Sequence, residues 1–257
     1  MRTFAPTLVL SHDTASAAAE AADRVAAALI EGRVLGLATG ATMAPLYRTL
    51  RDRLAGRRVP AQGVIGIALD EYVGVPPTYP ESFRAYLDRA FVGPFGLGRE
   101  QIVVPDGMAD DRLAAADRHE AAIATAGGID LQLLGIGANG HIGFNEPGSP
   151  LDSRTRDVDL SAETRNAQIA AFGTIGAVPT RAITVGIGTI LDAQQLLMLV
   201  TGEVKAAALA DALTGPIDPR CPASALRLHP DATVICDPAA ASQLGSLLGG
   251  PRVREIC

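Results

Sequence analysis

Short runs of Val, Ile and Leu recur along the chain and alternate with longer segments whose apolar residues follow helical spacing. Buried parallel strands joined by crossover helices give this pattern, because both faces of such a sheet are covered. We therefore predict an α/β fold with an open, twisted, mostly parallel sheet flanked by helices in three layers, as in Rossmann-like proteins. The predicted strands are residues 34–37, 64–69, 129–134, 183–185, 196–200 and 233–236.

Two alanine-rich segments give the clearest predicted helices. Residues 14–31 carry apolar positions at helical intervals and stop at Gly32, which suits the left-handed turn after a helix. Residues 110–125 follow the same pattern and end before a Gly-Gly pair. No repeat, low-complexity tract or Pro/Gly/Ser linker divides the chain, so we expect residues 1–257 to form a single domain.

Composition narrows the class of protein. Of 257 residues, 48% are hydrophobic and 19% are charged, which excludes intrinsic disorder. A formal net charge of −6 argues against nucleic acid or an anionic membrane as partner, and no apolar run approaches the ~20 residues that span a bilayer. Cys221, Cys236 and Cys257 have neither metal-ligand spacing nor a disulfide framework. We expect a cytoplasmic enzyme acting on a small molecule.

Ligands of such sheets bind at the carboxyl ends of the strands, and the first informative junction follows residues 34–37. It contains Thr39, Gly40, Ala41 and Thr42 and leads into a predicted helix near Met43. Small residues, hydroxyl groups and a helix N-terminus together favour binding of a phosphate group. The alternative is an ordinary turn whose threonine caps the helix.

The second junction places Asp70 and Glu71 directly after a predicted strand. A carboxylate that is partly shielded by neighbouring strands has a raised pKa and can act as a base toward a carbon acid. The alternatives are a solvated acidic turn, or a cap of the helix predicted near residues 81–91.

The third junction, after residues 129–134, is the richest in chemistry. Its glycines fold the backbone tightly enough to present Asn139, His141 and Glu146 to one cleft, where a histidine and a carboxylate form an acid/base pair. The alternative is a structural histidine, which is how we interpret His12, His119 and His229. One histidine and one carboxylate are too few for a closed metal site, so we expect no bound metal.

The fourth junction, after residues 196–200, brings Lys205 into the first turn of a helix predicted to run to residue 213. A cation there opposes the helix dipole, so an external anion explains it better than helix stability does. Lys205 is also the single lysine among 22 basic residues, although a chance placement remains the alternative.

These motifs resemble the glucosamine-6-phosphate deaminase family, also called the glucosamine-6-phosphate isomerase family. The most specific motif is Gly-His-Ile-Gly-Phe-Asn-Glu-Pro at residues 140–147; the related sugar-phosphate lactonases share the fold and a Gly-His element but lack the Phe-Asn-Glu-Pro continuation. The resemblance covers nearly the whole chain. The other matching segments are residues 36–42, 69–74, 80–83, 153–156, 184–189 and 228–230.

The resemblance implies conversion of glucosamine 6-phosphate to fructose 6-phosphate and ammonia by acid/base catalysis, without a metal or other cofactor, as part of amino-sugar metabolism such as N-acetylglucosamine catabolism. It implies that His141, supported by Asn139 and Glu146, opens the sugar ring and that Asp70 acts at C2. It further implies that Lys205 and residues 39–42 hold the phosphate, and that a lid lies near residues 159–178. Such a deaminase acts as a hydrolase and isomerase. Its oligomeric state stays open, and a homo-oligomer is one alternative.

Two departures from the family pattern keep alternatives open. Asn139 stands where many members carry Asp, and Ala170 stands where the lid usually carries an arginine that grips the phosphate. Arg165 could compensate from one helical turn away. The alternatives are a deaminase or isomerase for another amino-sugar phosphate, a non-catalytic homologue that binds sugar phosphates, and an enzyme that hydrolyses a lactone or ester.

Overall fold

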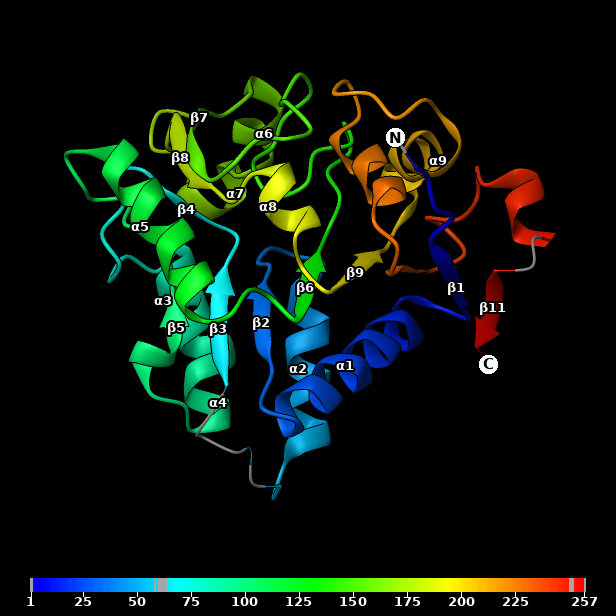
Figure 1. The fold of residues 1–257 in the computed structure, drawn as a ribbon, viewed down its shortest axis with the longest axis horizontal. Coiled ribbons are helices and arrows are strands. Elements are labelled where there is room, and N and C mark those ends of the chain that lie inside the picture. Colours follow the sequence, from blue (N-terminus) through cyan, green and yellow to red (C-terminus); the bar gives the residue numbers. More distant parts are fainter. Residues whose placement is uncertain (1, 58, 60–63, 250–251, 257) are drawn as a thin grey trace.

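The computed structural model describes residues 2–57, 59, 64–249 and 252–256, so Cys257 lies outside the described residues. Their main feature is an eight-stranded sheet with the order β11-β1-β10-β9-β6-β2-β3-β5, in which every neighbouring pair is parallel (Figure 1). The predicted parallel α/β sheet is therefore confirmed. Its strands are β1 (Thr7–Ser11), β2 (Val34–Leu37), β3 (Ile65–Ala68), β5 (Ile102–Val103), β6 (Leu131–Leu134), β9 (Gln195–Val200), β10 (Ala232–Cys236) and β11 (Val253–Ile256).

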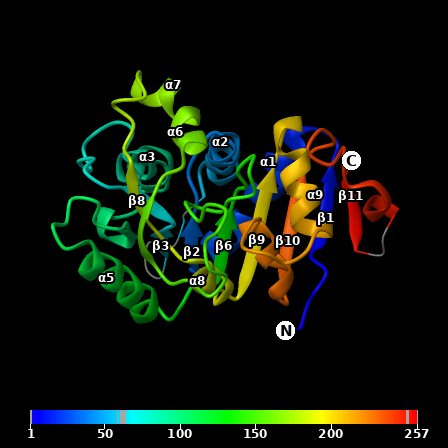
Figure 2. The same ribbon diagram turned by 90° about the horizontal axis from the view of Figure 1, so that it is seen from above.

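Helices cover both faces of this sheet. Seen from above, α1, α2 and α3 lie on one side, and α5 and α8 lie on the other (Figure 2). The α-helices are α1 (Thr14–Ile30), α2 (Met43–Leu54), α3 (Phe83–Leu87), α4 (Gly93–Phe95), α5 (Arg112–Thr125), α6 (Ala162–Ala167), α7 (Ile169–Phe172), α8 (Ile187–Leu191) and α9 (Ala206–Thr214). A π-helical turn at Asp88–Val92 continues α3 toward α4.

Helix α1 shows how the sequence sets an element's ends. The Asp13 side chain accepts a hydrogen bond from the Ser16 N–H at 2.7 Å and caps the first turn. Gly32, just after the helix, has a φ of +70°, which confirms the left-handed turn predicted there. Between these ends, small buried alanines allow α1 to pack closely against α2 and the sheet.

A second, three-stranded antiparallel sheet corrects the sequence prediction. Residues 183–185 were expected in the parallel sheet, but β8 (Arg181–Thr184) pairs antiparallel with both β4 (Asp70–Tyr72) and β7 (Arg156–Asp159). Both faces of β8 are covered, since Ala182 packs in an aromatic cluster and Ile183 packs against α5 alanines. A short strand buried on both faces has the same apolar pattern as a parallel core strand, so the pattern could not distinguish them.

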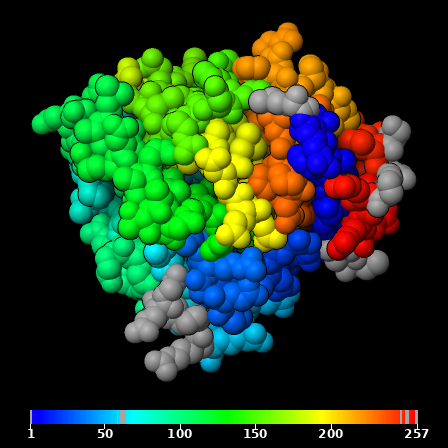
Figure 3. Space-filling model, in the orientation of Figure 1, coloured from blue at the N-terminus to red at the C-terminus, as the bar shows by residue number. Residues whose placement is uncertain are grey.

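The carboxyl ends of the central strands face the edge of the molecule that carries α6, α7 and α9. In the space-filling view, the chain around α6 and the chain around α9 form this upper edge (Figure 3). Below it, the aliphatic core runs through the sheet, with Leu133, Leu134 and Leu197 almost fully buried. None of the helices in the described ranges is both long and apolar enough to cross a bilayer.

We expect Leu197→Ala, in central strand β9, to lower the free energy of unfolding by about 2–5 kcal/mol through loss of apolar contact and creation of a cavity. The control is Leu113→Ala on α5, where the side chain is 74% exposed and the change should stay within about 0.5 kcal/mol. Urea unfolding of both variants measures the difference. Equal losses would contradict this description of the core.

Candidate active site

A cavity of about 340 Å³ lies at the carboxyl ends of β2, β3 and β6. Four consecutive lining residues, Thr39 to Thr42, form the loop between β2 and α2, as the sequence predicted. Gly40 has a φ of +99°, a conformation that favours glycine. Thr42 takes the N-cap position of α2 but makes no side-chain capping bond, so its hydroxyl remains available to a ligand. The loop can therefore offer N–H and hydroxyl groups to an anion.

Asp70 lines the same cavity although it is only 6% exposed. It begins β4, so the predicted single strand at residues 64–69 is in fact β3 followed by a passage into the second sheet. Burial first, and the neighbouring Glu71 charge second, raise the pKa of Asp70 to about 8. No hydrogen bond to its carboxylate forms within the described part of the chain. Asp70 is therefore a shielded carboxylate with no fixed partner, suited to take up a proton.

The loop after β6 brings together three of the predicted residues. Asn139 Nδ2 donates to Glu146 Oε2 at 3.0 Å, and Asn139 Oδ1 lies 2.8 Å from His141 Nδ1. Glu146 Oε2 is itself 3.7 Å from His141 Nδ1. Only His141 of the three lines the cavity, so Asn139 and Glu146 lie behind it as a hydrogen-bonded relay.

This relay fixes the tautomer of His141. Because the Asn139 amide donates to Glu146, its carbonyl oxygen accepts from the Nδ1–H of His141. Nε2 is then the unprotonated nitrogen. Burial lowers the pKa of His141, while the Glu146 carboxylate acts in the opposite direction and Lys205 lowers the pKa further. The imidazole is consequently neutral near pH 7 and can accept a proton at Nε2.

Gly137 makes room for this ring. A Cβ atom built at residue 137 would lie 2.1 Å from Cε1 and 2.2 Å from Nδ1 of His141. Any side chain there would displace the imidazole from its position beside Asn139. Two of the other histidines are buried: Nε2 of His119 contacts the carbonyl oxygen of Ala68 and Nε2 of His229 contacts that of Ala193. His12 is exposed, with Nδ1 3.7 Å from Asp13 Oδ2.

Lys205 also lines the cavity, but its local structure differs from the prediction. A 3₁₀ turn at Glu203–Lys205 precedes α9, so Lys205 is the N-cap residue of the helix rather than part of its first turn. The Gly202 N–H donates to both carboxylate oxygens of buried Asp237 at 3.1 Å, which anchors this turn to the end of β10. Burial lowers the pKa of Lys205.

The resemblance implies a lid near residues 159–178, but sequence reasoning did not name the side chains by which this segment reaches the cavity. Thr164, Ala167 and Gln168 line it from α6 and the residue that follows. Thr164 Oγ1 donates to Glu146 Oε1, and Ser161 Oγ donates to the same oxygen at 3.1 Å. The segment thus contacts the His141 relay directly. The capping pattern Ser161 to Thr164 marks a helix start in the sequence, but nothing there shows that this helix lies over the cavity.

Ala170 and Arg165 both belong to this segment, and neither side chain reaches the cavity. Ala170 is exposed and does not line the cavity. Arg165 does not compensate, since its Nη2 donates to the carbonyl oxygens of Ile175 and Val178 at 2.9 and 3.3 Å. Among the described lining residues, Lys205 and His141 are the only ones with a basic side chain. An anion in this cavity would therefore meet one ammonium group, the His141 ring, threonine hydroxyls and backbone N–H groups.

The described residues contain no group of three or more His, Cys, Asp or Glu side chains that could hold a metal ion. Cys221 and Cys236 are free thiols. The cavity therefore offers a carboxylate, an imidazole held by hydrogen bonds from behind, and an ammonium group that can attract an anion.

Comparison with known proteins identifies relatives that belong to one family. Residues 10–235 match the family described as glucosamine-6-phosphate isomerases/6-phosphogluconolactonase. A glucosamine-6-phosphate deaminase of Streptomyces avermitilis is 50% identical over 212 residues, covering 82% of this chain and 81% of the relative. One from Rhodopirellula baltica is 44% identical over 243 residues, with 92% and 94% covered.

Solved structures agree with these relatives. A structure described as a monomeric glucosamine-6-phosphate deaminase superposes with a TM-score of 0.88 at 39% identity, covering 92% of this chain and 99% of that one. A 6-phosphogluconolactonase from Trypanosoma cruzi superposes with a TM-score of 0.77 at 20% identity, covering 95% and 98%. At that identity the second likeness concerns the fold alone.

We expect Asn139→Asp to raise the pKa of His141 by about 1–3 units, because it places an opposite charge where Oδ1 now lies 2.8 Å from Nδ1. NMR titration of the His141 ring measures the shift in the absence of any substrate. The control is Asn166→Asp on the exposed side of α6, where solvent screens the new charge. An unchanged His141 pKa in Asn139→Asp would contradict the relay described above.

Proposed function

The chain belongs to the family of glucosamine-6-phosphate isomerases and 6-phosphogluconolactonases, and within it we propose that this protein is a glucosamine-6-phosphate deaminase. It converts glucosamine 6-phosphate and water to fructose 6-phosphate and ammonia. The observation that carries the proposal is one cavity that holds a shielded carboxylate, a neutral histidine and a cation. These groups suit a substrate that must exchange protons at carbon and oxygen while its phosphate is held.

In the first step, His141 opens the sugar ring. Nε2 accepts the proton of the anomeric hydroxyl and delivers it to the ring oxygen as the ring C–O bond breaks. Asn139 holds the orientation of the His141 imidazole, and Glu146 stabilises the imidazolium that forms transiently. The product of this step is the open-chain aldehyde with its 2-amino group.

Asp70 then acts between C2 and C1. It removes the C2 proton while the C1 oxygen gains a proton, which gives an enolamine. It then returns a proton to C1 while the amino group loses one, which leaves an imine at C2. Water adds to this imine, and ammonia leaves as the C2 carbonyl of fructose 6-phosphate forms. The reaction is therefore an isomerisation followed by a hydrolytic step. A carboxylate of raised pKa is a stronger base for the C2 proton than an exposed one.

The phosphate would be held by the loop after β2 and by Lys205. Thr39 to Thr42 offer backbone N–H groups at the start of α2, and Lys205 offers a half-buried ammonium. Fixing the phosphate there orients C1 and C2 toward Asp70. Burial lowers the pKa of Lys205, and the nearby Glu163 carboxylate acts in the opposite direction.

We further propose that residues 1–257 act as one unit and that the segment near residues 159–178 is its lid. Support comes from the bonds of Ser161 and Thr164 to Glu146, and from Gln168 on the cavity wall. Phe172, at the end of α7, packs against Tyr72 with ring centroids 5.3 Å apart. A cytoplasmic location and a homo-oligomeric state remain predictions from the sequence. One similar solved structure is described as a monomer.

Purified protein should release equal amounts of ammonia and fructose 6-phosphate from glucosamine 6-phosphate without added metal. Asp70→Asn should lower kcat by about 10²–10⁴-fold, because it removes the base while keeping the side-chain shape. Its thermal unfolding should match that of the wild type, which is the control for folding. If the wild type consumes another amino-sugar phosphate instead, the reaction class stands and the substrate assignment is wrong.

Lys205→Met should raise KM for glucosamine 6-phosphate by about tenfold to a hundredfold, since it removes a charge-assisted phosphate contact of about 1.5–3 kcal/mol. Steady-state kinetics measure the change. The matched control is Arg48→Met on the exposed face of α2, which should leave KM unchanged. Equal KM values for the wild type and Lys205→Met would place the phosphate elsewhere.

A further inference from the structure

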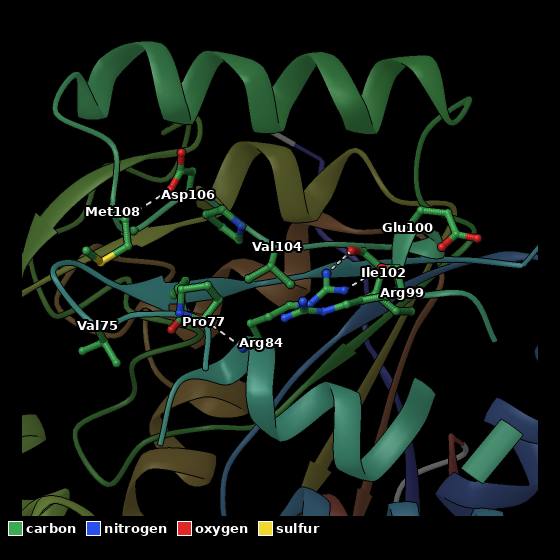
Figure 4. Close-up of a pocket in the computed structure, with 12 residues that line it drawn as sticks. Val75, Pro77, Arg84, Arg99, Glu100, Ile102, Val104, Asp106 and Met108 are labelled. Atoms are coloured by element: carbon green, nitrogen blue, oxygen red, sulfur yellow. Dashed lines mark hydrogen bonds between the residues drawn. The ribbon is translucent and has the colours of Figure 1, made fainter. Parts of the chain in front are cut away.

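Glu71 follows Asp70 in β4 and lies on the other side of the strand. Successive side chains of a strand point to opposite faces, so Asp70 faces the active-site cavity while Glu71 faces away from it. Glu71 instead lines a second cavity of about 500 Å³ whose other walls include Val75, Arg84 and Met108 (Figure 4). The side chain is only 3% exposed. A buried carboxylate therefore stands directly behind the proposed base.

Both oxygens of Glu71 are held by main-chain N–H groups. Oε1 accepts from Tyr72 at 2.8 Å and from Phe83 at 3.0 Å, and Oε2 accepts from Arg84 at 2.9 Å. These bonds join β4 to the first turn of α3, from which Phe83 reaches the wall of the active-site cavity. Burial raises the pKa of Glu71, while these three hydrogen bonds and the Arg84 charge act in the opposite direction and favour the ionised carboxylate. Glu71 thus fixes the segment that carries Asp70.

Arg84 makes no ion pair with this carboxylate. Its Nη1 donates to the carbonyl oxygen of Ile102 and its Nη2 to that of Arg99, both at 2.6 Å (Figure 4). Its Nε lies 3.1 Å from Asp88 Oδ1. Arg84 acts on Glu71 only through its charge, and Glu71 forms no ion pair within 4.0 Å with any described residue.

We propose that Glu71 is a positioning residue for the reaction: it holds Asp70 at the cavity wall, and its own charge makes Asp70 a stronger base. This inference rests on the proposed function. The other ionisable groups near this strand are Tyr72 on β4, Arg84 on α3 and His119 on α5, with His141 and Lys205 lining the active-site cavity. Apart from burial, Glu71 is the group that raises the pKa of Asp70.

Two substitutions change the charge and the clamp to different extents. Glu71→Gln keeps the side-chain length and a carbonyl acceptor for the Tyr72 and Phe83 N–H groups, but it removes the charge and the acceptor for the Arg84 N–H. Glu71→Asp keeps the charge but is one methylene too short to reach the start of α3. The measurement is the pH dependence of kcat/KM for glucosamine 6-phosphate, whose acidic limb reports protonation of the base in the free enzyme.

For the wild type, activity should fall as the pH drops below about 8, because protonated Asp70 cannot accept the C2 proton. In Glu71→Gln the pKa of Asp70 falls, so the limb should move to lower pH by about one unit while the plateau drops several-fold. In Glu71→Asp the limb should stay in place while kcat falls. A limb that does not move in Glu71→Gln, or that moves equally in both variants, overturns the proposal.

Carboxyl ¹³C NMR on the wild-type chain tests the same proposal without turnover. Glu71 should be ionised at pH 7 while Asp70 titrates near pH 8. A protonated Glu71 at pH 7 overturns the proposal, even if neither variant folds. If the wild type releases no ammonia from any amino-sugar phosphate, the proposed function fails, and the NMR titration still decides whether Glu71 acts on Asp70.

Discussion

The active site depends on how the chain passes from one sheet to the other at Leu69. The Leu69 N–H donates to the carbonyl oxygen of Leu37 at the end of β2, and its own carbonyl accepts from Val185 beyond β8 at 2.7 Å. One residue is thus hydrogen-bonded to the ends of strands in both sheets. Asp70, the next residue, must then emerge at the carboxyl edge of the parallel sheet, beside the phosphate loop that follows Leu37. Backbone pairing, more than side-chain contacts, sets the place of this carboxylate.

The carboxylates in and around the site differ in the number of hydrogen-bond donors that hold them. Asp70 has no hydrogen-bond partner in the described structure, whereas Glu71 has three N–H donors and Glu146 has an amide and two hydroxyl donors. A carboxylate held by several donors is fixed in place, while one that faces the cavity without a partner is free to exchange a proton. Burial keeps His141 neutral, and Asn139 directs its Nδ1–H. Roles thus follow from surroundings more than from residue type.

The rule that ligands bind at the carboxyl ends of parallel strands pointed to Thr39, Asp70, His141 and Lys205, because each lies in the loop or turn after an apolar run, and all four line one cavity. The second sheet could not be predicted, since β8 is covered on both faces and therefore has the pattern of a core strand. The contacts of Thr164 and Gln168 could not be predicted either. They depend on a segment that returns over the cavity, and local periodicity carries no information about such a return.

Lys205 is a single cation in a cavity of a chain whose formal net charge is −6. A doubly charged phosphate ester approaches against the overall field of the protein and meets attraction only at short range. Dissolved ions screen the long-range repulsion strongly, but they screen a half-buried ammonium much less. Moderate ionic strength should consequently speed the capture of the sugar phosphate, the reverse of the behaviour of enzymes that attract anions with a broad basic surface.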